Sequence, residues 1–171
     1  MFKYIRRHFF HSKNGGEEKK NLNPSKRPEL ITINHDNYHA KHVGYTNDGR
    51  QFFLTTPFEP ASNNNEGAEY VALFIFDREG NLIEDEIECF GPRKSVDPER
   101  ICECYEGKLE SLGAVIFGRI EVKPFKIERF ETEFGLIIRE PEEDGDVLAV
   151  ELQPGNYMAF FEPWDSGEYD T

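Results

Sequence analysis

The chain has 171 residues, of which 31% are charged and 37% are hydrophobic, and its formal net charge is −13. This length suits one ordinary domain, and fifteen phenylalanines and seven tyrosines supply apolar area for a core. No apolar run approaches the about 20 residues that span a bilayer, so the sequence predicts no transmembrane helix.

The charge is unevenly divided along the chain. Residues 1–28 hold eight Lys/Arg and two acidic residues, whereas residues 29–171 hold twelve Lys/Arg and 31 acidic residues. A body this acidic repels phosphate backbones, so direct nucleic-acid binding by the folded domain is not expected. A basic protein partner, a bound cation or solubility alone would each explain the charge.

Residues 1–28 are interpreted as a basic N-terminal extension followed by a flexible linker. Residues 1–10 are basic and aromatic and, as a helix, would have one apolar face that contacts an anionic membrane surface. So short a segment buries little area, which favours a packed or unfolded extension instead. Residues 11–28 are polar and interrupted by glycine and proline, as linkers are. We therefore expect a single α+β domain over residues 29–171.

Most of this domain alternates between segments typical of strands and of turns. Strands are expected, in chain order, over residues 38–46, 50–56, 69–76, 82–90, 120–130, 134–139, 147–152 and 157–161.

Turn residues and apolarity refine this prediction. Gly49 in Asn-Asp-Gly predicts a hairpin between the first two strands because glycine can take positive φ. Residues 57–67 are expected to form an exposed loop. The nearly continuous apolarity of residues 69–76 indicates a central strand buried on both faces, while the acidic residues 82–90 predict a half-exposed one. Pro124 places its strand at an edge or a bulge.

One helix is well marked. Asp97 is a suitable N-cap, Pro98 suits the first helical position, and Gly113 lies where a helix often ends. Between them an apolar stripe recurs at helical spacing, formed by Ile101, Tyr105, Leu109 and Leu112. The expected fold is therefore α+β, with a mainly antiparallel β-sheet of about eight strands and one amphipathic helix packed on it.

The three cysteines, Cys89, Cys102 and Cys104, form an odd number without framework spacing. This favours free thiols in a reducing compartment, and hence a cytoplasmic protein. On a helix Cys102 and Cys104 would point well apart, so packing in or beside the core is favoured over a metal site.

Three histidines, His35, His39 and His42, lie within eight residues. On a helix the first two would share a face and could bind zinc. The surrounding residues predict a turn and then a strand, in which His39 and His42 would face opposite sides. Hydrogen-bonded histidines beside the core are therefore favoured, and no metal site is assigned, with His39, His42 and Asp165 kept as candidate ligands.

Residues 155–171 combine a Pro-Gly turn, five aromatic rings and a cluster of carboxylates. So aromatic a segment is expected to dock onto the body of the protein. Its acids would hold a cation or act as an acid–base pair only if nearby rings exclude water, and a solvated terminus is the simpler interpretation. The candidate partner-binding residues are Trp164, Asp165, Glu168, Tyr169 and Asp170.

An ordered set of short motifs runs through the domain. It comprises Asn37-Tyr38-His39 before Val43-Gly44, Phe76-Asp77-x-x-Gly80-Asn81-Leu82, Leu112-Gly113, Ile120-Glu121-Val122, Phe134-Gly135-Leu136, and the ending Phe160-Phe161-Glu162-Pro163-Trp164-Asp165 with Tyr169-Asp170-Thr171. Over about residues 35–171 the chain resembles small bacterial proteins described as formate hydrogenlyase regulatory protein (HycA)-like. The resemblance implies a cytoplasmic regulator and carries over no catalytic residues.

Two functions follow as hypotheses. The first is a non-enzymatic cytoplasmic bacterial interaction or regulatory module, whose acidic surface binds a basic protein partner. The partner would be a regulator protein or, if this protein is an immunity-type inhibitor, a basic toxin. The absence of nucleophile, phosphate-loop and zinc-protease motifs favours it, and no catalytic residue or cofactor is assigned. The alternative is a small-molecule or metal-dependent enzyme, with a site formed by the C-terminal acidic and aromatic tail and the His39/His42 strand.

Overall fold

The computed structural model describes residues 26–142, 146–155, 157–165 and 167–169. For Glu168 and Tyr169 it describes only the backbone. The basic extension, including residues 1–10 and their suggested membrane contact, therefore lies almost entirely outside the described residues. The elements are β1 Ile31–Ile33, β2 His42–Thr46, β3 Gln51–Thr55, β4 Phe58–Glu59, β5 Ala68–Phe76, β6 Leu82–Gly91, α1 Pro98–Ser111, β7 Val115–Phe117, β8 Ile120–Val122, β9 Phe125–Arg129, β10 Thr132–Arg139, β11 Ala149–Gln153, β12 Met158–Phe160 and β13 Gly167–Tyr169.

The strands of the described residues form three antiparallel sheets. Six strands form the largest, in the order β4-β5-β3-β2-β7 with β6 also paired to β5, five form a second in the order β13-β12-β11-β10-β9, and β1 pairs with β8. The predicted α+β class and antiparallel pairing are confirmed, but the prediction of about eight strands is wrong. The strands that were missed, β1, β4, β7 and β13, have only two or three residues, too few to show a periodicity.

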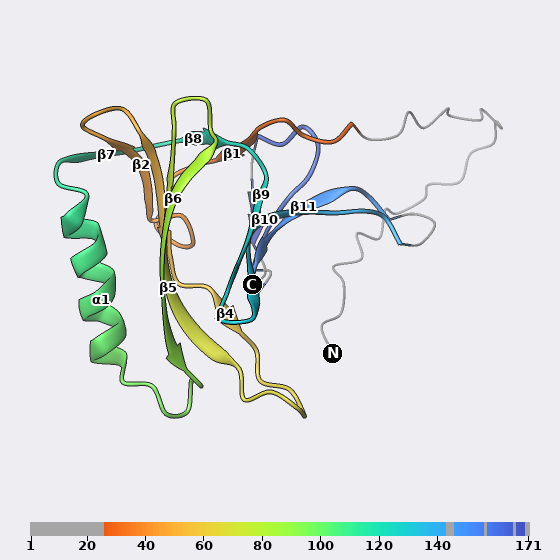
Figure 1. The fold of residues 1–171 in the computed structure, drawn as a ribbon. Helices are drawn as coiled ribbons and strands as arrows, with labels where there is room; N and C mark the ends of the chain where they lie inside the picture. The colour runs from red at the N-terminus through yellow and green to blue at the C-terminus, as the bar shows by residue number, and fades with distance from the viewer. Residues whose placement is uncertain (1–25, 143–145, 156, 166, 170–171) are drawn as a thin grey trace.

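The helix and the two larger sheets are arranged in layers. Figure 1 shows α1 on one side of the six-stranded sheet and the five-stranded sheet on the other. The central strand β5 separates the two buried regions, because its side chains alternate between them: Phe74 lies in the larger cluster, and Leu73 and Ile75 lie in the smaller one beside α1. This confirms the predicted burial of β5 on both faces.

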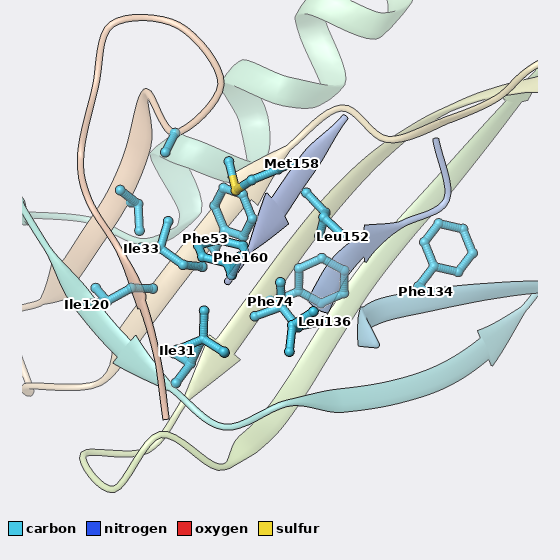
Figure 2. Packing of buried hydrophobic residues seen from close by; sticks show 14 of the residues in the cluster. Ile31, Ile33, Phe53, Phe74, Ile120, Phe134, Leu136, Leu152, Met158 and Phe160 are labelled. Carbon is cyan, nitrogen blue, oxygen red and sulfur yellow. The ribbon is translucent and has the colours of Figure 1, made fainter. Parts of the chain in front are cut away.

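The larger cluster joins all three sheets. Figure 2 shows its side chains converging from β3 and β5, from β10 to β12, and from the pair β1 and β8. Phe53 and Phe74 come from the first group, Leu136 and Phe160 from the second and Ile31 from the third, and each is at most 1% exposed. Burial of such side chains contributes roughly 1.5–3 kcal/mol each, so this cluster ties the C-terminal sheet to the rest of the described chain.

The helix agrees with its sequence signals. The Asp97 carboxylate accepts a hydrogen bond from the Glu99 backbone N–H, Pro98 is in the first turn, and the helix ends before Gly113, at φ 69°. The predicted stripe packs against the smaller cluster. The capping and the stripe together confirm the predicted helix.

Two strand predictions are corrected by turns and pairing. The strand expected from residue 38 begins only at His42, because the Asp36 carboxylate accepts hydrogen bonds from the Tyr38 and Ala40 N–H groups and bends the chain there. Pro124 lies neither in an edge strand nor in a bulge. It separates β8 from β9, which belong to different sheets, because proline lacks the N–H that would continue the ladder.

The cysteines are free, as expected, but their predicted packing role holds only in part. Cys104 is half-buried, whereas Cys89 and Cys102 are exposed. Cys89 lies two residues from the end of β6, which pairs only with β5, and Cys102 is not among the α1 residues that pack against the smaller cluster.

Residues 57–67 are less irregular than expected, since they include β4. Within the described part of the chain, no helix has the length and apolarity needed to cross a membrane.

Candidate functional site

A cleft of about 430 Å³ lies at one end of the six-stranded sheet. This volume falls within the about 300–1,000 Å³ of typical small-molecule sites. Its walls come from the start of β2, the end of β3, the start of β5, the segments after β3 and after β6, the middle of α1 and the residue before β12. The cleft therefore gathers residues that are far apart in the chain.

Antiparallel register explains why these strand ends meet. His42 at the start of β2 pairs with Leu54 near the end of β3, and Thr55 at that end pairs with Ala72 of β5. At the start of β5, Glu69 pairs with Gly91, the last residue of β6, so the chain that leaves β6 passes the same end of the sheet. Because strand ends are followed by loops, polar side chains are accommodated here without a break in the ladder.

One wall of the cleft is a row of aromatic rings that ends in a guanidinium. The Arg93 Cζ atom lies 5.3 Å from the centroid of the Phe58 ring. Phe58 stacks on Tyr157 with centroids 6.1 Å apart and planes at 19°. The Tyr157 ring lies 5.2 Å from the His39 ring, which contacts Tyr38 edge-on at 4.3 Å. Such contacts hold the rings in place and give the cleft a rigid apolar side.

An ion pair lies at the mouth of the cleft. The Arg93 Nε–H donates to the Glu69 carboxylate, and this bond together with the charge of Glu69 raises the pKa of Arg93. The Glu69 side chain is 15% exposed and that of Arg93 is 72% exposed. The carboxylate therefore anchors a guanidinium whose far side faces solvent.

The cleft is also lined by a histidine hydrogen-bonded to a tyrosine. His42 Nδ1 and the Tyr105 hydroxyl are 2.6 Å apart, while the same hydroxyl lies 3.4 Å from the Leu54 carbonyl oxygen. Burial raises the pKa of Tyr105 to about 12, so the phenol keeps its proton. Which atom donates in the shorter contact is set by the tautomer of His42, because the Tyr105 hydroxyl has a single proton to donate either to Nδ1 or to the Leu54 carbonyl oxygen.

Burial also sets the protonation of the other titratable groups. It lowers the pKa of His42, with Lys41 and His35 adding to the effect, and it lowers the pKa of His39, which the charge of Asp36 partly opposes. Both imidazoles are therefore neutral at pH 7. Burial raises the pKa of Tyr157 well above its usual range, and its hydroxyl shares a hydrogen bond with Thr55.

The structure brings two of the three candidate metal ligands together. His39 and His42 both line the cleft, so the prediction that they face opposite sides is wrong, because residues 37–41 bend instead of extending. Asp165 does not line it, and its backbone carbonyl accepts a hydrogen bond from the Asn34 side chain. Among the residues that the structure describes, no three His, Cys, Asp or Glu side chains are gathered in a way that suits a metal ion.

The C-terminal segment docks onto its own chain. Trp164 is 9% exposed within the larger core cluster, and its carbonyl accepts a hydrogen bond from the Thr32 N–H. Asp165 is exposed, and the backbone of Glu168 and Tyr169 belongs to β13, which pairs with β12. Asp170 lies outside the described residues. The suggested partner contacts at these five positions stay a prediction, and the Trp164 ring is engaged in the core.

Sequence reasoning missed most of the cleft. Glu69 and Arg93 lie beside strand ends that carry no recognisable motif, and Phe58 was assigned to a loop. Tyr105 was placed in the apolar stripe of the helix. Its hydroxyl was the one signal of a polar contact there, since a buried tyrosine usually finds a polar partner. Their proximity depends on strand register, which the sequence does not state.

The cleft has the groups for binding and for proton transfer. Two neutral imidazoles can accept protons, and the cationic side chains attract negative charge. No family model, no curated protein and no solved structure matches this chain. The resemblance to formate hydrogenlyase regulatory protein-like proteins therefore stays a prediction.

Proposed function

We propose that the protein is a non-enzymatic cytoplasmic interaction module that binds a basic protein partner through its acidic surface. The observation that carries the proposal is an acidic face, formed by exposed glutamates of α1 and of the adjacent strand β6. These glutamates are Glu84, Glu86, Glu88, Glu99, Glu103, Glu106 and Glu110. Charge of one sign on one face speeds the approach of an oppositely charged partner.

Contacts between α1 and β6 make this face continuous. Lys108 of α1 donates to the Glu86 carboxylate at 3.0 Å, and Cys104 Sγ lies 3.2 Å from a Glu88 carboxylate oxygen. The Lys108 side chain is only 13% exposed, so it lies beneath the glutamates and adds little positive charge to the outer surface. The helix thus presents mainly carboxylates to solvent.

The partner chemistry follows from this charge. A protein with an exposed Lys- and Arg-rich surface is complementary to the acidic face. A transcriptional regulator has such a surface, and so does a basic toxin, for which this protein would be the immunity-type inhibitor. The tail residues Asp165 and Glu168 are further candidate contacts for the same partner. The acidic face also protects the edge strand β6 from pairing with other chains. This protective role requires no partner, and the capture experiment below separates it from partner recognition.

The test is affinity capture from a lysate of the source cells at low and at high salt, read out by mass spectrometry. We expect wild-type protein to retain a specific basic protein at low salt and to release it at high salt. The substitutions Glu103→Lys, Glu106→Lys and Glu110→Lys together should abolish the capture.

A matched control changes the charge by the same amount elsewhere. The substitutions Glu128→Lys, Glu131→Lys and Glu142→Lys alter exposed residues outside the acidic face and should leave capture intact. Substitution of Asp165, Glu168 and Asp170 by lysine tests the tail separately. If the acidic-face and control variants capture the same proteins as wild type, the charge serves solubility and the proposal fails.

A small-molecule or metal-dependent enzyme is the second candidate function, and the cleft is the observation that favours it. Its tail contribution would come from Tyr157, because Asp165 does not line the cleft. Calorimetric titration with zinc tests the metal-dependent form. Binding of one zinc per chain that is lost in both His39→Ala and His42→Ala would support it, and binding unchanged in those variants would contradict it.

A further inference from the structure

The cleft differs from the rest of the protein in its charge. Two of its lining residues, Lys41 and Arg93, are cationic and one, Glu69, is acidic. Over residues 29–171, by contrast, 31 acidic residues face twelve Lys/Arg. Because mobile ions screen exposed charges beyond about 8 Å at physiological salt, the nearby cations dominate the field that a small ligand meets in the cleft.

Arg93 is held in a way that leaves donors for a ligand. Its bond to Glu69 uses Nε, and a guanidinium has five N–H donors. Its side chain is 72% exposed at the mouth of the cleft, and the Phe58 ring supports it from one side. Planar forks of this kind bind carboxylates through two parallel hydrogen bonds.

The aromatic wall supplies a surface for a flat apolar body. Phe58 and Tyr157 are stacked, and the Tyr157 ring contacts the His39 ring. Their mutual contacts and the Thr55 bond to the Tyr157 hydroxyl restrict their motion, so little entropy is lost when a ligand packs against them. The row leads directly from the interior of the cleft to the Arg93 guanidinium.

The segment of Lys41 and His42 adds a second cation to the cleft. The short contact between the Tyr105 hydroxyl and His42 Nδ1 holds the imidazole ring in place. His42 and Lys41 are consecutive and both line the cleft. An anionic ligand group is therefore attracted by two cations of the cleft, Lys41 and Arg93, whereas both would repel a ligand ammonium group.

From these features we infer that the cleft binds a small organic anion with a flat aromatic body, of the class of aromatic carboxylic acids. The ring packs against the wall formed by Phe58 and Tyr157, and the carboxylate binds the Arg93 guanidinium, while Lys41 adds positive charge to the same cleft. This site is separate from the acidic face, and its existence does not depend on a protein partner.

The test is binding to the full-length protein, followed by shifts of its backbone amide NMR signals. The probes are 4-hydroxybenzoate, indole-3-acetate and 2-naphthoate, each compared with its primary amide, which keeps the shape and loses the charge. We expect the acids to shift the signals of residues at Lys41, Thr55 and Arg93, and to bind at least about tenfold more tightly than the amides, a difference of about 1.4 kcal/mol.

The Arg93→Gln variant separates recognition from structure. It removes the guanidinium and leaves the Glu69 carboxylate facing the cleft without its partner. Affinity for the acids should fall about tenfold, and affinity for the matching cation, 4-(aminomethyl)phenol, should rise. A purely structural effect would weaken acid, amide and amine alike. Arg100→Gln, which alters an exposed cation of α1 outside the cleft, is the matched control and should change none of these affinities.

Further variants keep the inference open to refutation. If Arg93→Gln lowers the stability of the fold, Lys41→Gln, at an exposed position, should still weaken binding of the acids. The inference is wrong if no acid shifts signals at the cleft at about 10 mM, a concentration that reveals even millimolar affinity, or if acids and amides bind equally. The acidic-face variants should bind the acids normally, so failure of partner capture would not be mistaken for failure here.

Discussion

His42 is the residue in which burial, hydrogen bonding and charge act together on one ionisable group. Its pKa lies below the ordinary value of 6.5 because of burial, with Lys41 and His35 acting in the same direction. In the unfolded chain the imidazole gains its proton at a higher pH than in the folded protein. Between those two values the unfolded state binds more protons, so stability rises with pH there.

This predicts a loss of stability in mild acid. The free energy of unfolding should fall as the pH is lowered from about 7.5 to about 5.5, and His42→Gln should remove part of that fall. Urea denaturation of both proteins at the two pH values measures the difference. Equal falls in wild type and His42→Gln would show that His42 does not contribute.

Gly107 shows how one residue in a helix lowers stability without a packing reason. It lies inside α1 and is exposed, and a Cβ added there meets no atom within 4 Å. Gly107→Ala should therefore raise the free energy of unfolding by about 1 kcal/mol.

Gly135 is the contrasting control for that measurement. A Cβ at Gly135 would lie 2.1 Å from the Phe125 carbonyl oxygen, and its φ is 142°. Gly135→Ala should lower the free energy of unfolding by more than about 2 kcal/mol, as measured by urea denaturation. If both substitutions act in the same direction, the local geometry does not decide the outcome.

At the scale of elements, the β9–β10 hairpin departs from local preference. Arg129 pairs with Thr132, so its two-residue loop consists of Phe130 and Glu131, with φ values of 53° and 59°. Residues with side chains disfavour this left-handed region, and hairpins of this kind usually carry Asn-Gly or Asp-Gly. The sequence accordingly contains no turn signal here, and pairing of the long strand β10 with β9 holds the loop in place.

Glycine at the second loop position should relieve this strain. Glu131→Gly is expected to raise the free energy of unfolding by about 1 kcal/mol, because left-handed backbone costs a side-chain-bearing residue roughly 1–2 kcal/mol. Thermal and urea denaturation measure the change. Glu128→Gly, within the neighbouring strand, should have the opposite effect because glycine weakens strands, and a matching effect of the two would contradict the account.

At the scale of the whole molecule, the larger core cluster links the C-terminal sheet to the N-terminal part of the domain. Phe160 of β12 is fully buried in the same cluster as Phe53 and Phe74. The Trp164 ring belongs to this cluster too, and it is the only tryptophan in the chain. Its fluorescence therefore reports on the cluster, whereas far-ultraviolet circular dichroism reports on all the sheets and the helix.

We predict that Phe160→Ala lowers the free energy of unfolding by about 3–5 kcal/mol, as large-to-small core substitutions do. Unfolding followed by tryptophan fluorescence and by circular dichroism should give the same transition in wild type and variant. Two separate transitions would show that the sheets unfold independently, and the prediction of a single domain over residues 29–171 would then fail.

Local signals in the sequence determined the features that depend on neighbouring residues. Asp97, Pro98 and Gly113 set the limits of the helix, because caps and backbone preferences act within a turn. The apolar run of β5 predicted burial on both faces, because successive residues of a strand point to opposite sides and a continuous apolar run makes both sides apolar. The α+β class follows from the number and type of such segments.

Only the tertiary structure decided which strands pair and what lies at their ends. Residues 120–130 looked like one interrupted strand but contribute to two sheets, since pairing partners leave no mark in a short segment. The cleft brings together His42, Tyr105 and Tyr157, which are far apart in the chain. Their meeting depends on strand register and on how α1 and the five-stranded sheet pack, and periodicity within one segment contains no information about either.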